Sequence, residues 1–192
     1  MWIVGLVLLA TAVVAVLVLL RARNRMADLR HRVENGRRQI DVQLARRHDL
    51  IPSLVEVVRG AMKYEHETLE ALVRACGEAR RALVQASGEA APSLDAEARL
   101  STTLSQTLSL VDQHPELRAL ANVRALQEEL ASTENRIAFA RQHYNDVATA
   151  FNAARDQLPA SLFGRGSMPA ALWEAPAGAA EMPALNLNIA RA

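Results

Sequence analysis

A heptad repeat in the last third of the sequence constrains the fold more than any other feature. Apolar or small residues recur there at alternating steps of four and three without a gap. They are Leu126, Leu130, Thr133, Ile137, Ala140, Tyr144, Val147, Phe151, Ala154 and Leu158. This spacing places all ten side chains on one face of an α-helix. We expect the helix to begin near Asn122 and to end before Pro159, a length of about 35 residues or roughly 52 Å.

The residues of this repeat differ too much in size for a symmetric coiled-coil dimer, because Thr133 and Ala140 stand beside Tyr144 and Phe151. We therefore expect the helix to pack against other helices of its own chain. An antiparallel bundle, with helices crossing at about 20°, is the common solution for long helices of this kind.

Three earlier segments also have helical periodicity. Their apolar positions are Leu29, Val33, Ile40, Leu44, Ile51, Leu54 and Val58 in the first, Leu69, Leu72, Cys76, Ala79 and Leu83 in the second, and Leu94, Ala98, Ser101, Leu104, Leu108 and Val111 in the third. The small and polar run from Gln85 to Ser93 ends the second helix, and His114-Pro115 ends the third. Pro52 predicts a kink or a break around His48 to Ile51, because proline lacks an N–H and crowds the carbonyl four residues earlier.

An apolar segment precedes these helices. Nineteen uncharged residues run from Trp2 to Leu20, enough for roughly 28 Å of helix, which spans a bilayer core. A cleaved signal peptide would have a basic N-terminal region and a shorter apolar run, so a retained anchor is favoured. Arg21, Arg23 and Arg25 follow the segment at once. The positive-inside rule then places the N-terminus outside and the C-terminal part in the cytoplasm, as in a single-pass protein of the inner (cytoplasmic) membrane.

Charge is unevenly distributed although the formal net charge is only +1. Nine arginines and three acidic residues lie between Arg21 and Arg47, and the rest of the chain is net acidic. The basic stretch fits either topological sorting with a solvated helix face or attraction to anionic lipid, at about 1 kcal/mol per residue near the surface. The near-neutral total argues against a general nucleic-acid binder.

These observations divide the chain into three parts: residues 1–22 as a transmembrane anchor, 23–160 as a helical bundle, and 161–192 as a tail rich in Pro, Ala and Gly that we expect to be mostly disordered. Leu162-Phe163 and Trp173 of the tail are candidates for docking on the bundle. With only seven Pro, eight Gly and seven aromatic residues, the predicted fold class is all-α, an N-terminal transmembrane helix followed by an antiparallel four-helix bundle with long helices.

Residues with catalytic or metal-binding patterns are not found. The only Asp-x-x-His pair, Asp28 and His31, lies among arginines next to the membrane segment, and Glu65-His66-Glu67 lacks the second His of a zinc motif. There is no Gly-rich phosphate loop or nucleophile motif, and Cys76 lies on an apolar face where a thiol is usually inert. We expect no enzyme activity, no cofactor and no metal site.

Polar residues are dense beside the apolar faces of the first and last helices. The candidates are Gln43, Arg47, His48, Asp49, Glu129, Glu134, Asn135, Arg136, Tyr144 and Asn145. One interpretation is a set of inter-helix hydrogen bonds that fix helix register. The other is a recognition surface for a second protein, and the two are compatible.

Two stretches resemble the most characteristic segments of the LemA family of bacterial membrane proteins. One runs from Val42 to Glu56 (VQLARRHDLIPSLVE), and the other from Leu126-Gln127-Glu128-Glu129-Leu130 through Thr133 to Gln142 and on to Tyr144-Asn145. Phe151-Asn152, Leu158-Pro159 and Leu162-Phe163-Gly164 are similar to that family's ending, so the resemblance covers roughly residues 2–165. The chain departs from the family's pattern in having Lys63 as its only lysine and in its extension after Gly166.

The resemblance implies a short outward N-terminus, one transmembrane helix and a cytoplasmic helical bundle, and it supplies no catalytic residues. A related branch is associated with magnetosome membranes, and relatives are linked to membrane zinc metalloproteases. The hypothesis is therefore a scaffold or adaptor held in the membrane lipid by its N-terminal helix, with another membrane or cytoplasmic protein as partner. The alternative is an accessory or regulatory subunit of a membrane enzyme such as a zinc metalloprotease. The oligomeric state is left open.

Overall fold

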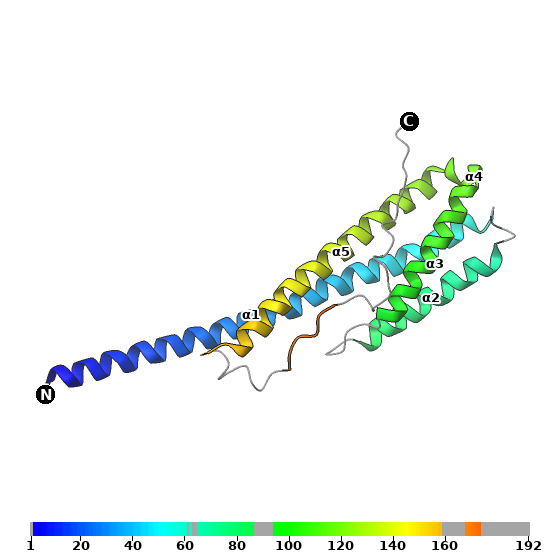
Figure 1. The fold of residues 1–192 in the computed structure, drawn as a ribbon. Coiled ribbons are helices and arrows are strands. Elements are labelled where there is room, and N and C mark those ends of the chain that lie inside the picture. The colour runs from blue at the N-terminus through cyan, green and yellow to red at the C-terminus, as the bar shows by residue number, and fades with distance from the viewer. Residues whose placement is uncertain (1, 61, 63–64, 87–93, 159–167, 174–192) are drawn as a thin grey trace. The chain divides into compact units, whose positions relative to one another are not determined.

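The computed structural model describes residues 2–60, 62, 65–86, 94–158 and 168–173. Within these residues every regular element is a helix, as Figure 1 shows. The helices are α1 (Trp2–Val58), α2 (His66–Gln85), α3 (Leu94–Gln113), α4 (Pro115–Arg118) and α5 (Ala121–Asp156). The all-α fold class predicted from the sequence is confirmed. Residues 87–93 lie outside the described residues, as does most of the predicted tail, including the docking candidates Leu162-Phe163.

Helix α1 runs for 57 residues and contains Pro52. Of the kink or break expected around His48 to Ile51, the break is therefore wrong. Proline removes the N–H that would bind the His48 carbonyl, and the structure supplies another donor, because the Cys76 Sγ lies 3.5 Å from the His48 oxygen. Ile51 and Leu54, on either side of the proline, are buried in the apolar core. Packing and a replacement donor thus keep the helix continuous.

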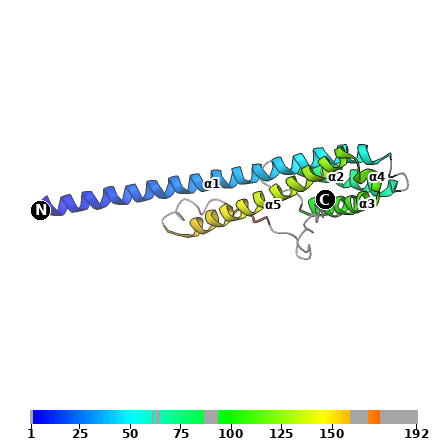
Figure 2. The ribbon, with the colours of Figure 1, turned by 90° about the horizontal axis from the view of Figure 1, so that it is seen from above.

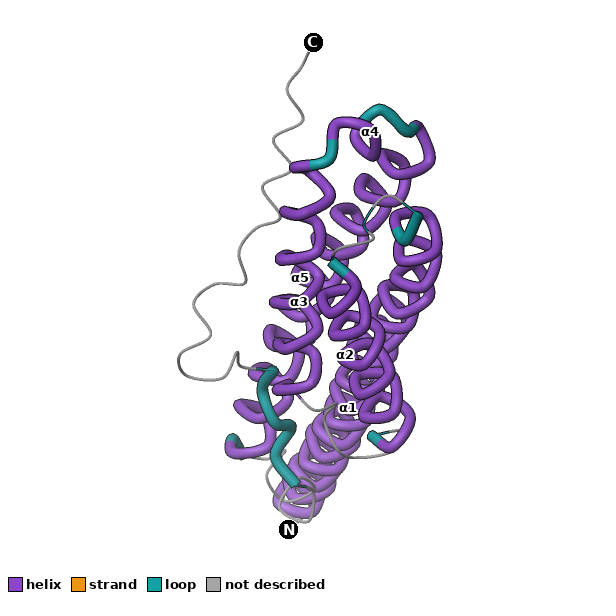
Figure 3. Tube along the Cα trace, turned by 90° about the vertical axis from the view of Figure 1, so that its right-hand side faces the viewer, coloured by secondary structure: helices purple, strands orange, loops and turns teal. Residues whose placement is uncertain are grey.

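The ends of the later helices differ slightly from expectation. The short helix α4 was not predicted; it begins at Pro115, a favourable first residue because its missing N–H has no partner in a first turn. Helix α5 begins at Ala121, one residue before the expected cap, and the Asn122 side-chain oxygen accepts a hydrogen bond from the Val123 N–H at 3.0 Å. The backbone trace of Figure 3 follows the chain from α3 through α4 into α5.

The described residues form two compact units. Residues up to Gln39 and from Ala140 to Leu172 make the first, and residues from Ile40 to Phe139 together with Trp173 make the second. In the second unit α2 packs against α3 and α3 against α4, as Figures 1 and 2 show. Its apolar core combines residues of α1, α2, α3, α4 and α5, among them Leu54, Leu72, Leu100, Leu117 and Leu130.

The first unit has a smaller core. Met26, Phe151 and Ala154 form its centre, and Ala22, Leu29, Val33 and Ala170 pack against them. Helices α1 and α5 approach closely at Gly36, where an added Cβ would lie 3.4 Å from the Tyr144 Cα. Along the heptad repeat seven positions are buried, Leu126 and Val147 are half-buried, and only Leu158 is exposed.

The N-terminal part of α1 is apolar and exposed. Trp2 is 91 % exposed and Ile3 78 %, and the side chains through Leu20 are likewise uncovered. Among the described residues, α1 is the one helix whose length and composition would allow it to cross a membrane.

Candidate functional site

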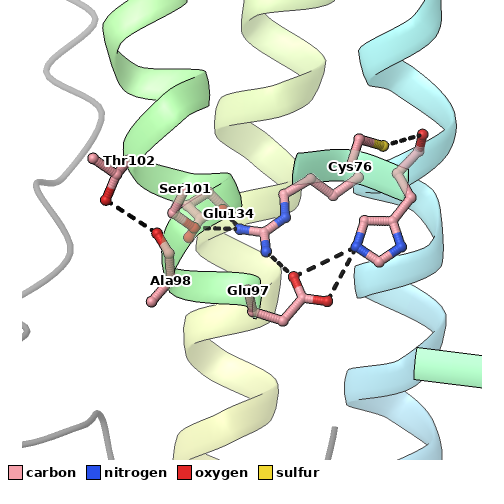
Figure 4. Close-up of polar contacts among 8 residues, drawn as sticks. Cys76, Glu97, Ala98, Ser101, Thr102 and Glu134 are labelled. Carbon is pink, nitrogen blue, oxygen red and sulfur yellow. Dashed lines mark hydrogen bonds and ion pairs between the residues drawn. The ribbon is translucent and has the colours of Figure 1, made fainter. Parts of the chain in front are cut away.

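Arg47 is the central residue of the candidate site in the second unit. It occupies a position on the apolar face of α1, between Leu44 and Ile51, and its side chain is 1 % exposed. The guanidinium forms an ion pair with Glu97 of α3, donates to Glu134 of α5 at 2.9 Å, and donates to the Ser101 hydroxyl at 2.8 Å. Figure 4 labels the three partners of this guanidinium, Glu97, Ser101 and Glu134. One arginine therefore joins three helices.

His48 lies beside Arg47 and contacts the same carboxylate. Its Nε2 lies 3.1 Å from the Glu97 Oε1 and 3.4 Å from Oε2, and the ring is 1 % exposed. We call Arg47, His48, Glu97, Ser101 and Glu134 the buried ion cluster. Burial alone would raise the pKa of Glu97, but hydrogen bonds and attraction from His48 and Arg47 outweigh it and hold this pKa below its ordinary value. The cluster thus keeps the Glu97 carboxylate ionised inside the core.

The cluster is not completely hydrogen-bonded. The Arg47 Nε and the His48 Nδ1 are buried and have no partner among the described residues. Such atoms carry a desolvation cost of about 1–3 kcal/mol each, which makes the cluster costly to assemble. Because of this cost, the cluster favours the single arrangement of the helices in which its remaining hydrogen bonds can form.

Cys76 of α2 lies next to this cluster. Its thiol donates to the His48 carbonyl, and burial raises its pKa despite the opposing charges of Arg80 and Arg47. A thiol held protonated and used as a hydrogen-bond donor is a poor nucleophile.

Two ion pairs lie at the surface of the same unit. Arg46 Nη2 is 2.7 Å from Glu129 Oε1, with both side chains more than 40 % exposed. Arg80 of α2 pairs with Asp49, whose side chain is 71 % exposed. Asp49 therefore links α1 to α2 at the surface.

The structure brings only some of the predicted polar residues together. Arg47, His48 and Glu134 meet in the cluster, while Asp49 and Glu129 make the surface pairs. Gln43 is half-buried, its side-chain oxygen has no partner among the described residues, and Asn135 and Arg136 are exposed. Tyr144 and Asn145 belong to the first unit, where the Tyr144 hydroxyl donates to the Ala171 carbonyl at 2.7 Å. The predicted membrane-flanking residues Trp2, Arg21, Arg23 and Arg25 are exposed on α1.

Glu97 and Ser101 are cluster residues that the sequence interpretation missed. The burial of Glu97 could have been predicted from a second helical repeat in α3. Alternating steps of three and four also connect Glu97, Leu100, Leu104, Thr107 and Val111. All five are buried. A carboxylate on a buried face requires a buried cation, and Arg47 interrupts the apolar face of α1 in the same way.

Chemically, the cluster links three helices through its ion pairs and hydrogen bonds. The described part of the chain has no set of three or more His, Cys, Asp or Glu residues placed to hold a metal ion. Arg47, His48 and Glu97 are buried, Ser101 and Glu134 are half-buried, and each of the five contacts another member of the cluster.

Comparison with known proteins identifies the family. The model of the LemA family matches residues 36–186, which is most of the 192-residue chain. The match starts after the apolar segment and extends into the C-terminal tail, farther than the resemblance noted in the sequence. No curated protein matches the chain. On the strength of the family match, this chain belongs to the LemA family.

Proposed function

We propose that the protein is a non-enzymatic scaffold or adaptor, anchored in the cytoplasmic membrane by the start of α1, with its helical domain in the cytoplasm. The observation that carries the proposal is the exposed apolar part of α1. Trp2 and the residues through Leu20 have no protein cover, and soluble proteins rarely expose an apolar patch of this size. A lipid bilayer is the environment that covers such a helix.

The orientation rests on charge. Arg21, Arg23 and Arg25 follow the apolar residues directly. By the positive-inside rule the domain after Leu20 then faces the cytoplasm.

For the domain itself we propose an antiparallel four-helix bundle of α1, α2, α3 and α5. Contacts within the first unit support opposite directions for α1 and α5. Gly36 approaches Tyr144, whereas Met26, nearer the N-terminus, packs with Phe151 and Ala154, nearer the C-terminus.

A scaffold role also fits the chemistry of the buried ion cluster. Arg47 and Glu97 hold each other, and the Cys76 thiol serves as a donor to a backbone carbonyl. Groups used in this way stabilise helix packing and are not available for proton transfer or nucleophilic attack on a substrate.

Membrane extraction tests the anchor. A Val13→Arg substitution places a charge in the middle of the apolar segment, at a cost of about 2.5 to 3.5 kcal/mol for insertion. Val42→Arg is the matched control, because Val42 lies on the same helix, is 62 % exposed and lies outside the apolar segment. We expect the wild type and Val42→Arg to stay in membranes at alkaline pH and Val13→Arg to be released in part. Complete release of the wild type would contradict the anchor.

Site-specific crosslinking in native membranes tests the adaptor role. A photoreactive phenylalanine analogue at Phe139, which is 76 % exposed, should crosslink to a partner, and the same analogue at Ile137, which is 1 % exposed, should not. The crosslinked partner could be a membrane enzyme. If the activity of that enzyme falls in a Phe139→Asp variant, the result would favour the accessory-subunit alternative. Equal crosslinking at both positions would contradict a partner surface on this side of α5.

A further inference from the structure

A short non-helical segment of the tail, residues 168–172, belongs to the first unit and is bound there through its backbone. The Asn152 side-chain amide donates to the Ala170 carbonyl at 2.9 Å and accepts from the Ala170 N–H at 2.9 Å. The Tyr144 hydroxyl donates to the next carbonyl, that of Ala171, at 2.7 Å. In Figure 1 this segment lies in the orange stretch between two grey traces. Two side chains of α5 thus bind three backbone groups of two adjacent residues.

In these hydrogen bonds the tail segment takes part through its backbone atoms and not through its side chains. An Asn amide carries a donor and an acceptor, so it pairs with both groups of one residue in an extended chain, whatever that residue is. A small side chain is favoured at position 170, because Ala170 packs against the apolar cluster of Met26, Phe151 and Ala154. Pro169 disfavours helical geometry at Met168.

We propose that Asn152 and Tyr144 form a binding site for an extended peptide, occupied here by the chain's own residues 168–172 and open to a partner segment of the same chemistry. The segment that fits is uncharged and has a proline followed by two small residues, in the order seen in Pro169, Ala170 and Ala171. The tail then acts as an intramolecular competitor. The inference adds a ligand class to the first unit and does not depend on membrane anchoring.

The proposal predicts that weakening the tail's own binding opens the site. Asn152 and Ala170 are 18 residues apart, and a tether of that length gives an effective concentration in the millimolar range. A free peptide at micromolar concentration therefore cannot displace the wild-type segment. Ala170→Pro removes the N–H that Asn152 accepts from, so this variant should bind the free peptide.

The experiment uses the full chain in detergent micelles and a fluorescein-labelled synthetic peptide of residues 168–172, followed by fluorescence anisotropy. We expect Ala170→Pro to bind the peptide at least tenfold more tightly than the wild type does. Ala171→Pro is the matched control, because within the described residues no partner is found for the Ala171 N–H. It should behave like the wild type.

Further variants assign the site. In the Ala170→Pro background, Asn152→Leu and the milder Tyr144→Phe should each weaken peptide binding, the former at least tenfold, and a peptide with proline at position 170 should not bind. Absence of binding to Ala170→Pro, with or without a change in its helical circular dichroism, would overturn the proposal and leave the segment as a fixed part of the fold. Binding that survives Asn152→Leu would place the peptide elsewhere and would also overturn it. Neither result bears on membrane extraction, so the anchor is tested separately.

Discussion

Arg46 and Arg47 are adjacent in the sequence and occupy opposite environments. Arg47 is buried between Glu97 and Glu134, whereas Arg46 meets Glu129 at the surface. Breaking a buried ion pair leaves an uncompensated charge, while an exposed pair contributes little because water already solvates both groups. Substituting each of these two arginines in turn therefore compares a buried ion pair with an exposed one on the same helix.

We predict that Arg47→Met lowers the free energy of unfolding by about 3–5 kcal/mol, and that Arg46→Met lowers it by about 0–1 kcal/mol. Urea unfolding of the full chain in detergent micelles, followed by circular dichroism, measures both. Adding Glu97→Gln to Arg47→Met should recover part of the loss, because it removes one of the two stranded carboxylates. Equal, small losses for both arginine variants would contradict a buried cluster.

The lowered pKa of Glu97 makes the stability of the protein depend on pH. Because the carboxyl titrates below its ordinary value of 4.5 in the folded state, its contribution is fully present above that value and is lost as pH falls through the folded-state pKa. Arg47 and His48 of α1, Cys76 of α2 and Glu134 of α5 surround it.

We predict that the wild type is more stable than Glu97→Gln at neutral pH and that this difference shrinks as the solution is acidified below about pH 4.5. Thermal unfolding between pH 7 and 3 measures it, with Glu128→Gln as the control for an exposed carboxylate. If the difference in stability between the wild type and Glu97→Gln stays constant down to pH 3, the lowered pKa of Glu97 would be contradicted.

At the scale of the single residue, the sequence predicted the presence of buried polar groups better than their partners. Arg47 interrupts a regular apolar face, so its burial follows from helical periodicity alone. Its pairing with Glu97 depends on which faces of α1 and α3 meet, and these residues are 50 positions apart. A long-range relation of this kind is not contained in local spacing.

At the scale of the helix, the heptad repeat of α5 predicted burial well. It also provides a matched pair of aromatic residues, since Phe151 lies on the repeat and is 5 % exposed whereas Phe139 lies off it and is 76 % exposed. Both side chains have the same intrinsic effect on helix formation, so a difference between them measures packing.

We predict that Phe151→Ala lowers the free energy of unfolding by about 3–5 kcal/mol, the usual cost of emptying a large core position, while Phe139→Ala lowers it by less than about 1 kcal/mol. Guanidinium unfolding curves of the two variants give the comparison. If both losses are similar, the heptad face of α5 does not form the core of the first unit.

The helix scale also shows where local rules fail. Proline rules predicted a kink or a break before Pro52, and the helix does not break there, because the thiol of Cys76, 28 residues away from His48, replaces the lost donor. The short helix α4 was missed because four residues are too few to show a period. In both cases tertiary context or length, and not residue type, determined the outcome.

At the scale of the whole molecule, composition and periodicity predicted the all-α class, and two long sequence stretches predicted the LemA family, which the family match confirms. The two tail residues whose backbone binds α5 were less accessible to sequence reasoning. Their hydrogen bonds run through backbone atoms of Ala170 and Ala171, which carry no signal in the side-chain sequence.

The central claim is that the chain crosses the membrane once with its helical domain in the cytoplasm. Membrane-impermeant maleimide labelling in intact cells tests it most directly, in a Cys76→Ala background that removes the only native thiol. One variant carries Gln106→Cys at an exposed position of α3, and the matched variant carries Trp2→Cys at the other end of the apolar segment. The account predicts labelling of the Trp2→Cys variant in intact cells and of the Gln106→Cys variant only after lysis. Labelling of Gln106→Cys in intact cells would contradict it.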